Sequence, residues 1–199
     1  VGRGIRILPV RVLGKCGGYD SDIIAGMYWA AGFSIPGVPA NPHPARVLNL
    51  SLAGPGTCSQ AYVDVINALA TQKNAVVVAS AGNEAGLPVE TPANCSGVIG
   101  VAGLRNVGTK VGFSSMGPEV DISAPGGNCV NLTGACLYPI LTTTNSGNTT
   151  PVANSAAYTN SFDVSLGTSF SAPLVAGSAA VLWASQPTLT VAEVHDTLV

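Results

Sequence analysis

The sequence predicts an α/β fold built on a mostly parallel β-sheet. Apolar runs alternate with segments of helical character along the first half of the chain. Two of these runs, Ala75–Ala81 and Val98–Leu104, are nearly continuous, which is typical of strands buried on both faces of a sheet. The connections between segments are short. This β-α-β order favours right-handed crossovers that place helices against the sheet.

Five elements are predicted in the chain before Val98. In chain order these are a strand at Ile5–Leu13, a helix at Ser21–Ala31 capped by Asp20 or Ser21, a strand at Arg46–Leu52, a helix at Ser59–Lys73, and the strand at Ala75–Ala81. Val98–Leu104 follows as a further buried strand. The helix before Ala75 has apolar residues at helical spacing, so we expect one of its faces to cover the sheet.

Beyond Phe113 the regular alternation of apolar runs and helical segments ends. The elements predicted there are irregular strands and hairpins at Asp121–Gly126 and Cys129–Thr144, a polar surface loop at Asn145–Thr150, and a buried helix from Ser169 to about Ser185. Thr190 and Glu193 predict a capping box for a short last helix, with Leu189 packing on Val194 as a hydrophobic staple.

Length and composition limit the number of domains and the kinds of partner that can be expected. With 199 residues the chain is expected to form one domain, residues 1–199. Only 9% of its residues are charged and the net charge is −2, without a basic run, which argues against nucleic acid and against electrostatic membrane binding. The longest apolar stretch, Ala172–Ala184, is shorter than the roughly 20 residues of a bilayer span, so no membrane partner is expected.

The five cysteines show no CxxC spacing, and only two histidines accompany them. This pattern argues against a zinc site. An odd number of cysteines in a composition of this kind instead suggests two disulfide bonds and one cysteine left over.

The strongest chemical signal is GTSFSAP, residues Gly167–Pro173, directly before the apolar helix. A serine there lies beside free backbone N–H groups and the positive end of the helix dipole, where developing negative charge is stabilised. Pro173 is expected in the first turn, where its missing N–H costs nothing. The alternative is that Thr168 or Ser169 only caps the helix. Ser171 stands where a GxSxG motif would have its second glycine.

GTSFSAP resembles the nucleophile motif of the subtilisin-like serine proteases, the subtilases. Three further segments resemble that family in the family's order: Asn49–Gly54 (NLSLAG), Ala79–Glu84 (ASAGNE), and Phe113–Asp121 (FSSMGPEVD) with Ala124–Gly126 (APG). The resemblance extends from Val10 to Leu198. It implies a three-layer subtilisin-like sandwich, of which this chain would be the serine-bearing, C-terminal part.

The resemblance also implies roles for single residues. Ser169 would be the nucleophile, and Asn83 would donate its side-chain amide to the oxyanion together with the Ser169 backbone N–H. The implied substrate-binding residues are Gly17 and Gly18 on one side of the substrate, Ser51, Leu52, Ala53 and Gly54 on the other, and Ala81, Gly82, Glu90 and Thr168 near the cleaved bond.

Glu90 aligns with the position at which many subtilases carry glycine, at the floor of the S1 pocket. This alignment comes from counting back from Val98 along the family's pattern. This pocket takes the P1 side chain, which precedes the cleaved bond. A carboxylate there favours lysine or arginine through a charge-assisted hydrogen bond. The alternative is a slip of the alignment within the loop Leu87–Pro92, which would leave Glu90 pointing to water.

Two disulfide bonds are expected, Cys58–Cys95 beside the pocket and Cys129–Cys136 across a local hairpin. Cys16 would then find its partner in an N-terminal portion outside this chain. Several disulfide bonds indicate an oxidising environment, so a secreted, extracellular protein is expected.

Asp121 aligns with a carboxylate that binds calcium in proteinase K-like members of the family. Backbone carbonyls of Ser96 and Val98 would complete the oxygen ligands that this cation prefers. The alternative is that Asp121 caps a turn or pairs with an arginine.

A subtilase also needs a catalytic aspartate and a catalytic histidine, both of which precede the strand that corresponds to Ile5–Leu13. This chain contains neither of them. His43 and His195 follow the wrong elements. We therefore expect a secreted serine endopeptidase that acts on proteins or peptides through an acyl-enzyme on Ser169, with the aspartate and histidine in an N-terminal segment. This chain alone should hydrolyse peptides barely, if at all. The alternative is a non-catalytic, subtilase-like module that binds peptides.

Overall fold

The computed structural model describes residues 2–127, 138–160 and 166–199, and its centre is a four-stranded sheet. The strands are β1 (Val47–Leu50), β2 (Val76–Ser80), β3 (Val98–Leu104) and β4 (Ile122–Pro125), side by side in that order. All three neighbouring pairs are parallel. The mostly parallel sheet expected from the sequence is confirmed.

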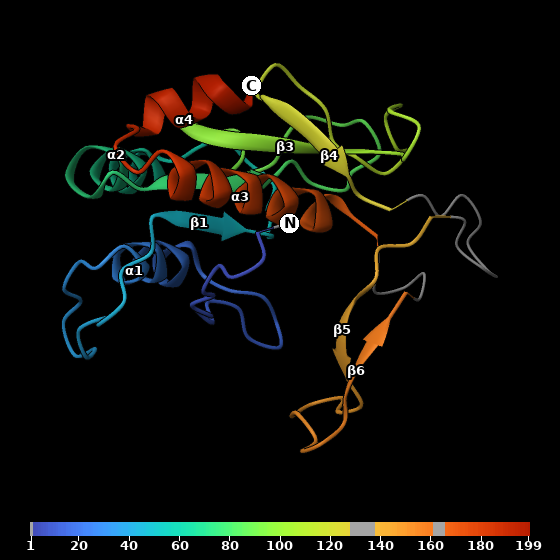
Figure 1. Ribbon diagram of the computed structural model, residues 1–199, viewed down its shortest axis with the longest axis horizontal. Coiled ribbons are helices and arrows are strands. Elements are labelled where there is room, and N and C mark those ends of the chain that lie inside the picture. The colour runs from blue at the N-terminus through green and yellow to red at the C-terminus, as the bar shows by residue number, and fades with distance from the viewer. Residues whose placement is uncertain (1, 128–137, 161–165) are drawn as a thin grey trace.

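Helices cover both faces of this sheet and complete a three-layer sandwich (Figure 1). One face packs against α1 (Asp20–Ala30) and α2 (Gln60–Lys73), and the other against α3 (Thr168–Ser185) and α4 (Val191–Leu198). Strand β2 divides its side chains between the two cores: Val77 faces the first pair of helices, whereas Val76 and Val78 face the second. All five residues of β2 are buried, which is why the sequence shows a continuous apolar run there.

The predicted first strand, Ile5–Leu13, is the main correction to the sequence-based fold. The segment is extended, with Val10 and Val12 packed against the core of α1 and α2, but it is not a paired strand. A groove of about 950 Å³ separates it from the free edge of β1 and is also lined by α1 and α3. Without a neighbour within hydrogen-bonding distance, an apolar segment of high strand propensity stays an isolated extended chain.

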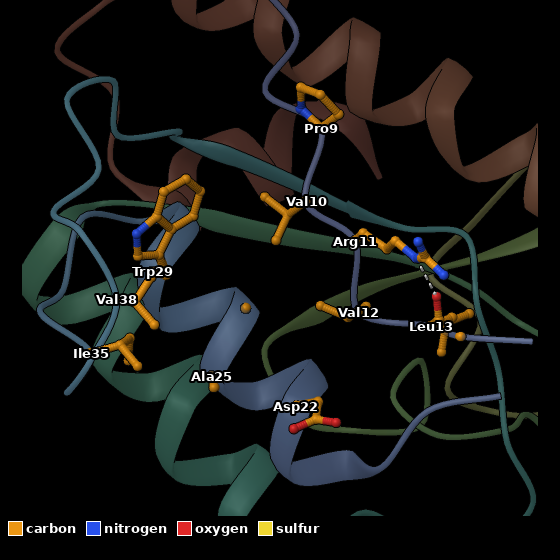
Figure 2. A pocket seen from close by; sticks show the side chains of 12 residues that line it. Pro9, Val10, Arg11, Val12, Leu13, Asp22, Ala25, Trp29, Ile35 and Val38 are labelled. Atoms are coloured by element: carbon orange, nitrogen blue, oxygen red, sulfur yellow. Dashed lines mark hydrogen bonds between the residues drawn. The ribbon is translucent and has the colours of Figure 1, made fainter. Parts of the chain in front are cut away.

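A second hollow, of about 560 Å³, lies along the same segment (Figure 2). Val10 and Val12 line it together with Trp29 of α1 and with Ile35 and Val38 of the following loop. Both hollows therefore share the extended segment as a wall, and the packing around it is open compared with that around β2.

The helix ends show which capping signals in the sequence are reliable. The prediction that Asp20 or Ser21 caps α1 is wrong, because Tyr19 occupies the N-cap and makes no side-chain cap hydrogen bond. Asp20 lies inside the first turn and accepts a hydrogen bond of 3.1 Å from the Tyr62 hydroxyl. The capping box of α4 is confirmed, with Thr190 and Glu193 bonded reciprocally. These bonds lower the pKa of the Glu193 carboxyl.

The later part of the chain forms an antiparallel hairpin of β5 (Thr142–Asn145) and β6 (Ala156–Thr159), which projects away from the sheet (Figure 1). The loop predicted at Asn145–Thr150 lies mostly within its connection. The expected Cys129–Cys136 bond lies outside the described residues. No helix in the described ranges combines the length and hydropathy required to span a membrane.

Candidate active site

Ser169 is the second residue of α3, one residue after the helix begins at Thr168. Gly167, at the N-cap, has a φ of 135° that favours glycine, and its N–H donates to the Gly126 carbonyl at 2.8 Å. This tie holds the entry into α3 against the end of β4. The half-buried Ser169 donates from its Oγ to the Ser51 carbonyl at 3.3 Å. Two of the segments singled out in the sequence therefore meet at this hydroxyl.

Asn83 lies in the loop after β2 and faces the first residue of α3. Its Oδ1 accepts a 2.9 Å hydrogen bond from the Thr168 N–H. The buried Thr168 hydroxyl accepts from the Gly82 N–H at 3.2 Å and lies 3.1 Å from both the Gly82 carbonyl and Asn83 Oδ1. These contacts orient the amide group with its oxygen towards Thr168. The Asn83 Nδ2 amide, which makes no hydrogen bond within the described residues, remains as a donor beside Ser169.

Pro173 lies deeper in α3 than the sequence suggested. It is the sixth residue of the helix and not part of the first turn. Because it has no N–H, it cannot donate to the carbonyl four residues earlier, which belongs to Ser169. The Ser51 hydroxyl takes that place and donates to the Ser169 carbonyl at 2.7 Å. The nucleophile candidate and the predicted substrate-binding segment are thus joined in both directions.

Ser115 is a site residue that sequence reasoning did not identify, although its segment was among the matched motifs. It is fully buried, and its Oγ accepts from the Glu84 N–H at 3.1 Å. Its own N–H donates to the Gly82 carbonyl at 3.0 Å. Ser115 therefore holds both sides of Asn83. The signal available in the sequence was a pair of serines, at 114 and 115, between apolar and glycine-rich stretches.

The side chain of Glu90, from the loop before β3, lies against Gly82. A side chain on Gly82 would collide with the Glu90 carboxylate, and Gly82 has a φ of 106° that favours glycine. Partial burial raises the pKa of the Glu90 carboxyl, the negative charge of Glu84 raises it further, and a hydrogen bond from the Asn83 backbone N–H opposes the shift. The carboxylate thus lies against the loop that carries Asn83.

The Cys58–Cys95 disulfide is confirmed, with the two Cα atoms 5.1 Å apart. It joins the chain before α2 to the loop before β3. Asn94 strengthens the same connection by donating from Nδ2 to the Gly56 carbonyl at 2.8 Å. The segments around Gly54 and Glu90 are therefore held together covalently and by hydrogen bonds.

The other predicted substrate-binding residues are placed as follows. Leu52 and Ala53 follow β1, and the Leu52 carbonyl accepts from the Ser80 hydroxyl at 3.3 Å. Ala81 is buried and bonded through its backbone to Glu90 and Val101. Gly17 and Gly18 lie in an exposed turn closed by backbone bonds between Gly14 and Gly17. Within the described ranges, no hydrogen bond joins this turn to the cluster around Ser169.

Asp121 lies on the side of the sheet that carries α4, directly before β4. Its Oδ2 accepts from the Gly100 N–H at 2.8 Å, and its Oδ1 is 3.5 Å from His195 Nε2. The partner of Asp121 is thus a histidine and not the arginine considered as an alternative. Among the residues that the structure describes, no three His, Cys, Asp or Glu side chains gather as a metal site.

Neither histidine accompanies Ser169. His195 contacts Asp121 and Asp196, while His43 borders the groove beside β1. Within the described part of the chain, Ser169 therefore has an oxyanion donor candidate but no general base.

Comparison with known proteins gives one family match and three similar proteins. The Subtilase family, Peptidase_S8, matches residues 1–199. The extracellular protease of Xanthomonas campestris pv. campestris is 40% identical over 98% of this chain, and the extracellular basic protease of Dichelobacter nodosus is 41% identical over 100% of it. A solved protease structure from Pseudoalteromonas arctica PAMC 21717 is similar with a TM-score of 0.85, at 41% identity over 95% of this chain. The chain spans 31% of the length of each of the two curated relatives and 53% of the solved chain.

Proposed function

Because the chain belongs to the subtilase family, we propose that it is the serine-bearing part of an extracellular serine endopeptidase that cleaves peptide bonds in proteins. The observation that carries this proposal is the cluster in which Ser169 lies at the start of α3 with the Asn83 amide oriented beside it. The names of the extracellular relatives and the Cys58–Cys95 disulfide support secretion.

In the proposed reaction, Ser169 Oγ attacks the carbonyl carbon of the scissile bond and passes its proton to a general base. Asn83 Nδ2 and the Ser169 N–H stabilise the oxyanion. When the intermediate collapses, the leaving amine takes that proton and an ester on Ser169 remains. Water then attacks the ester, again through an oxyanion, and the serine hydroxyl is restored. The substrate backbone would lie along Ser51–Gly54, opposite the turn that contains Gly17 and Gly18.

We propose that the base, with its aspartate, comes from a segment of the same protein outside residues 1–199. Two observations support this. His195 contacts Asp121, and His43 borders the groove beside β1. In addition, β1 has a free edge that faces an apolar groove of about 950 Å³ between both helix layers, which is space for a further strand.

The proposed nucleophile predicts a site of covalent labelling. A fluorophosphonate probe should react with the complete protein at Ser169, with loss of fluoride, and mass spectrometry of the digested protein identifies the labelled peptide. Ser169→Ala should remain unlabelled. Ser171→Ala is the matched control, since Ser171 lies two residues further along the same helix and is buried. Labelling of Ser169→Ala to the wild-type extent would contradict the proposal.

A non-catalytic peptide-binding module is the second candidate, and the absence of a base near Ser169 in the described residues favours it. The same experiment separates the two functions. If the complete protein binds peptide substrates but neither cleaves them nor reacts with the probe, the second function holds.

We also propose a calcium ion at Asp121, with the backbone carbonyls of Ser96 and Val98. These oxygen atoms belong to the ligand class that calcium takes. Against this, one Asp121 oxygen already accepts a backbone hydrogen bond, and the other faces His195. Calcium would supply a link between the loop before β3 and the start of β4, and so stabilise the folded protein.

Calcium removal is therefore expected to lower the Tm of the complete protein by roughly 5–10 °C, if the site is nearly saturated beforehand. Differential scanning calorimetry with calcium and with EGTA measures the shift. Asp121→Asn should show a much smaller difference between the two conditions, whereas Asp64→Asn, which changes an exposed carboxylate on α2, should behave as the wild type does. Equal Tm values with calcium and EGTA in the wild type would rule out a stabilising site.

A further inference from the structure

The loop after β2, residues 82–87, carries Asn83 in a backbone conformation that its own residues do not favour. Ala85 has a φ of 48°, in the left-handed region that alanine rarely adopts. Gly82 and Gly86 also have positive φ values, of 106° and 87°. A loop of this kind keeps one shape only where the surrounding structure holds it, so the position of Asn83 depends on what the loop contacts.

Residues 113–116 provide these contacts. Their backbone and that of the loop are joined by four hydrogen bonds, from the Ala85 N–H to the Phe113 carbonyl at 2.8 Å, from the Gly86 N–H to the Ser114 carbonyl at 3.0 Å, from the Ser115 N–H to the Gly82 carbonyl at 3.0 Å, and from the Met116 N–H to the Leu87 carbonyl at 2.9 Å. The two segments therefore lie side by side. One of these bonds is made by Ala85 itself, which helps to keep that residue in its unfavourable conformation.

Ser115 contacts the loop at the two peptide groups that flank Asn83. Its N–H donates to the carbonyl of the peptide group before Asn83, and its Oγ accepts, at 3.1 Å, from the N–H of the peptide group after Asn83. Fixing both peptide groups fixes the direction in which the Asn83 side chain leaves the backbone. The Thr168 N–H then orients the end of that side chain by donating to Oδ1 at 2.9 Å. Ser115 thus holds the backbone of Asn83, and Thr168 holds its amide group.

The hydroxyl groups of the neighbouring residues Ser114 and Ser115 have different partners, although both side chains are fully buried. Ser114 Oγ accepts from the Gly103 N–H in β3 and donates to the Ser115 carbonyl, with both distances 3.0 Å. Ser115 Oγ instead accepts from the Glu84 N–H in the loop. The hydroxyl of Ser114 therefore serves the packing of this segment on the sheet, and only the hydroxyl of Ser115 reaches the loop that carries Asn83.

We propose that Ser115 is a positioning residue whose hydroxyl keeps the Asn83 amide where the oxyanion forms, an inference that rests on the proposed protease function. An oxyanion donor stabilises the transition state only if it is already in place when the negative charge develops. Without the acceptor on Ser115, the peptide group after Asn83 loses its partner and the strained loop loses a support. Because Ser115 is fully buried, it acts through Asn83 and not by contact with the substrate.

The first test is Ser115→Ala in the complete protein, which removes the acceptor and keeps the backbone N–H at position 115. We expect kcat for a peptide substrate to fall roughly 10-fold with KM nearly unchanged, which is less than the loss expected when the donor itself is removed. Ser115→Cys replaces the hydroxyl by a group of similar size that accepts hydrogen bonds weakly, so it should lose kcat as well. Wild-type kcat in Ser115→Cys would mean that the alanine variant suffers from a cavity, and would overturn the proposal.

The decisive test repeats Ser115→Ala in an Asn83→Asp background, where the amide donor is absent. A residue that acts through Asn83 has no donor left to position there, so kcat should fall no further. A residue that merely stabilises the fold would lower kcat by the same factor in both backgrounds, and this result would contradict the positioning role. The concentration of active sites is titrated with the fluorophosphonate probe, so that unfolded protein does not enter kcat. If Ser115→Ala does not fold, Ser115→Cys takes its place in both backgrounds.

Ser114→Ala is the matched control, because Ser114 is equally buried and its hydroxyl also makes two contacts. Differential scanning calorimetry should show a lower Tm for both alanine variants, whereas kcat of Ser114→Ala should stay close to the wild-type value. An equal loss of kcat in the two variants would overturn the specific role of Ser115. If the wild-type protein cleaves no peptide, the protease proposal itself fails. If it cleaves peptides and one of the contrary results above is found, the protease proposal stands and only the role of Ser115 is wrong.

Discussion

Replacing Asn83 by aspartate is expected to lower kcat of the complete protein by roughly 10²- to 10³-fold, with a much smaller change in KM. Aspartate keeps an oxygen that accepts the hydrogen bond from the Thr168 N–H, which is 2.9 Å long in the structure. It removes the amide N–H groups, and these are the donors that the oxyanion needs. The loss appears in kcat because the negative charge develops only in the transition state.

Asn83→Leu provides the matched comparison, because leucine removes both the donor and the acceptor. If Asn83 acts as an oxyanion donor, both variants lose kcat to a similar extent. If Asn83→Asp keeps most of the activity while Asn83→Leu loses it, Asn83 acts by holding Thr168 and α3 in place, and the donor role is wrong. Steady-state kinetics with one peptide substrate measure kcat and KM for all three proteins.

Removing the Cys58–Cys95 disulfide is expected to lower the free energy of unfolding by about 4 kcal/mol, from the chain-entropy estimate for a loop of this length. The two cysteines are 37 residues apart in the sequence. The loop between them contains helix α2 and strand β2, so the bond restricts a large part of the unfolded chain. The measurement is urea denaturation of Cys58→Ala/Cys95→Ala in a Ser169→Ala background, which prevents self-digestion.

The control for this second prediction is the same pair of proteins under strong reductant. There the bond is absent from both, so the difference in unfolding free energy should nearly close. A difference that persists would mean that the cysteine side chains stabilise the fold by packing, since Cys95 is buried, and that the cross-link contributes little.

The elements that the sequence predicted well are those whose environment is uniform. The strand Val98–Leu104 has the same bounds in the structure, because every position except its last is buried and the apolar run ends where burial ends. The helix predicted from Ser169 begins at Thr168. For the strand, local composition is sufficient, since burial on both faces needs no partner-specific pattern.

Predictions that depended on a partner or on the register within a helix were less accurate. Ile5–Leu13 has the composition of a strand, yet pairing depends on a neighbour that composition does not reveal. Pro173 was expected in the first turn, although the predicted start at Ser169 already made it the fifth residue, and the observed start at Thr168 makes it the sixth. The contact of Ser115 with Glu84 was not predictable either, because residues 31 positions apart meet through the fold and not through a local motif.

The position of Pro173 has a consequence for how stability and activity are balanced in this protein. A proline within a helix costs about 3 kcal/mol relative to alanine. Here the Ser169 carbonyl, left without a helical donor, is bonded by the Ser51 hydroxyl at 2.7 Å. An alanine at position 173 would restore the helical N–H, strengthen α3 and compete with Ser51 for that carbonyl. The helix would gain stability while the nucleophile lost its direct link to the segment that we propose binds the substrate, so this proline is a position where thermostability and turnover are expected to change in opposite directions.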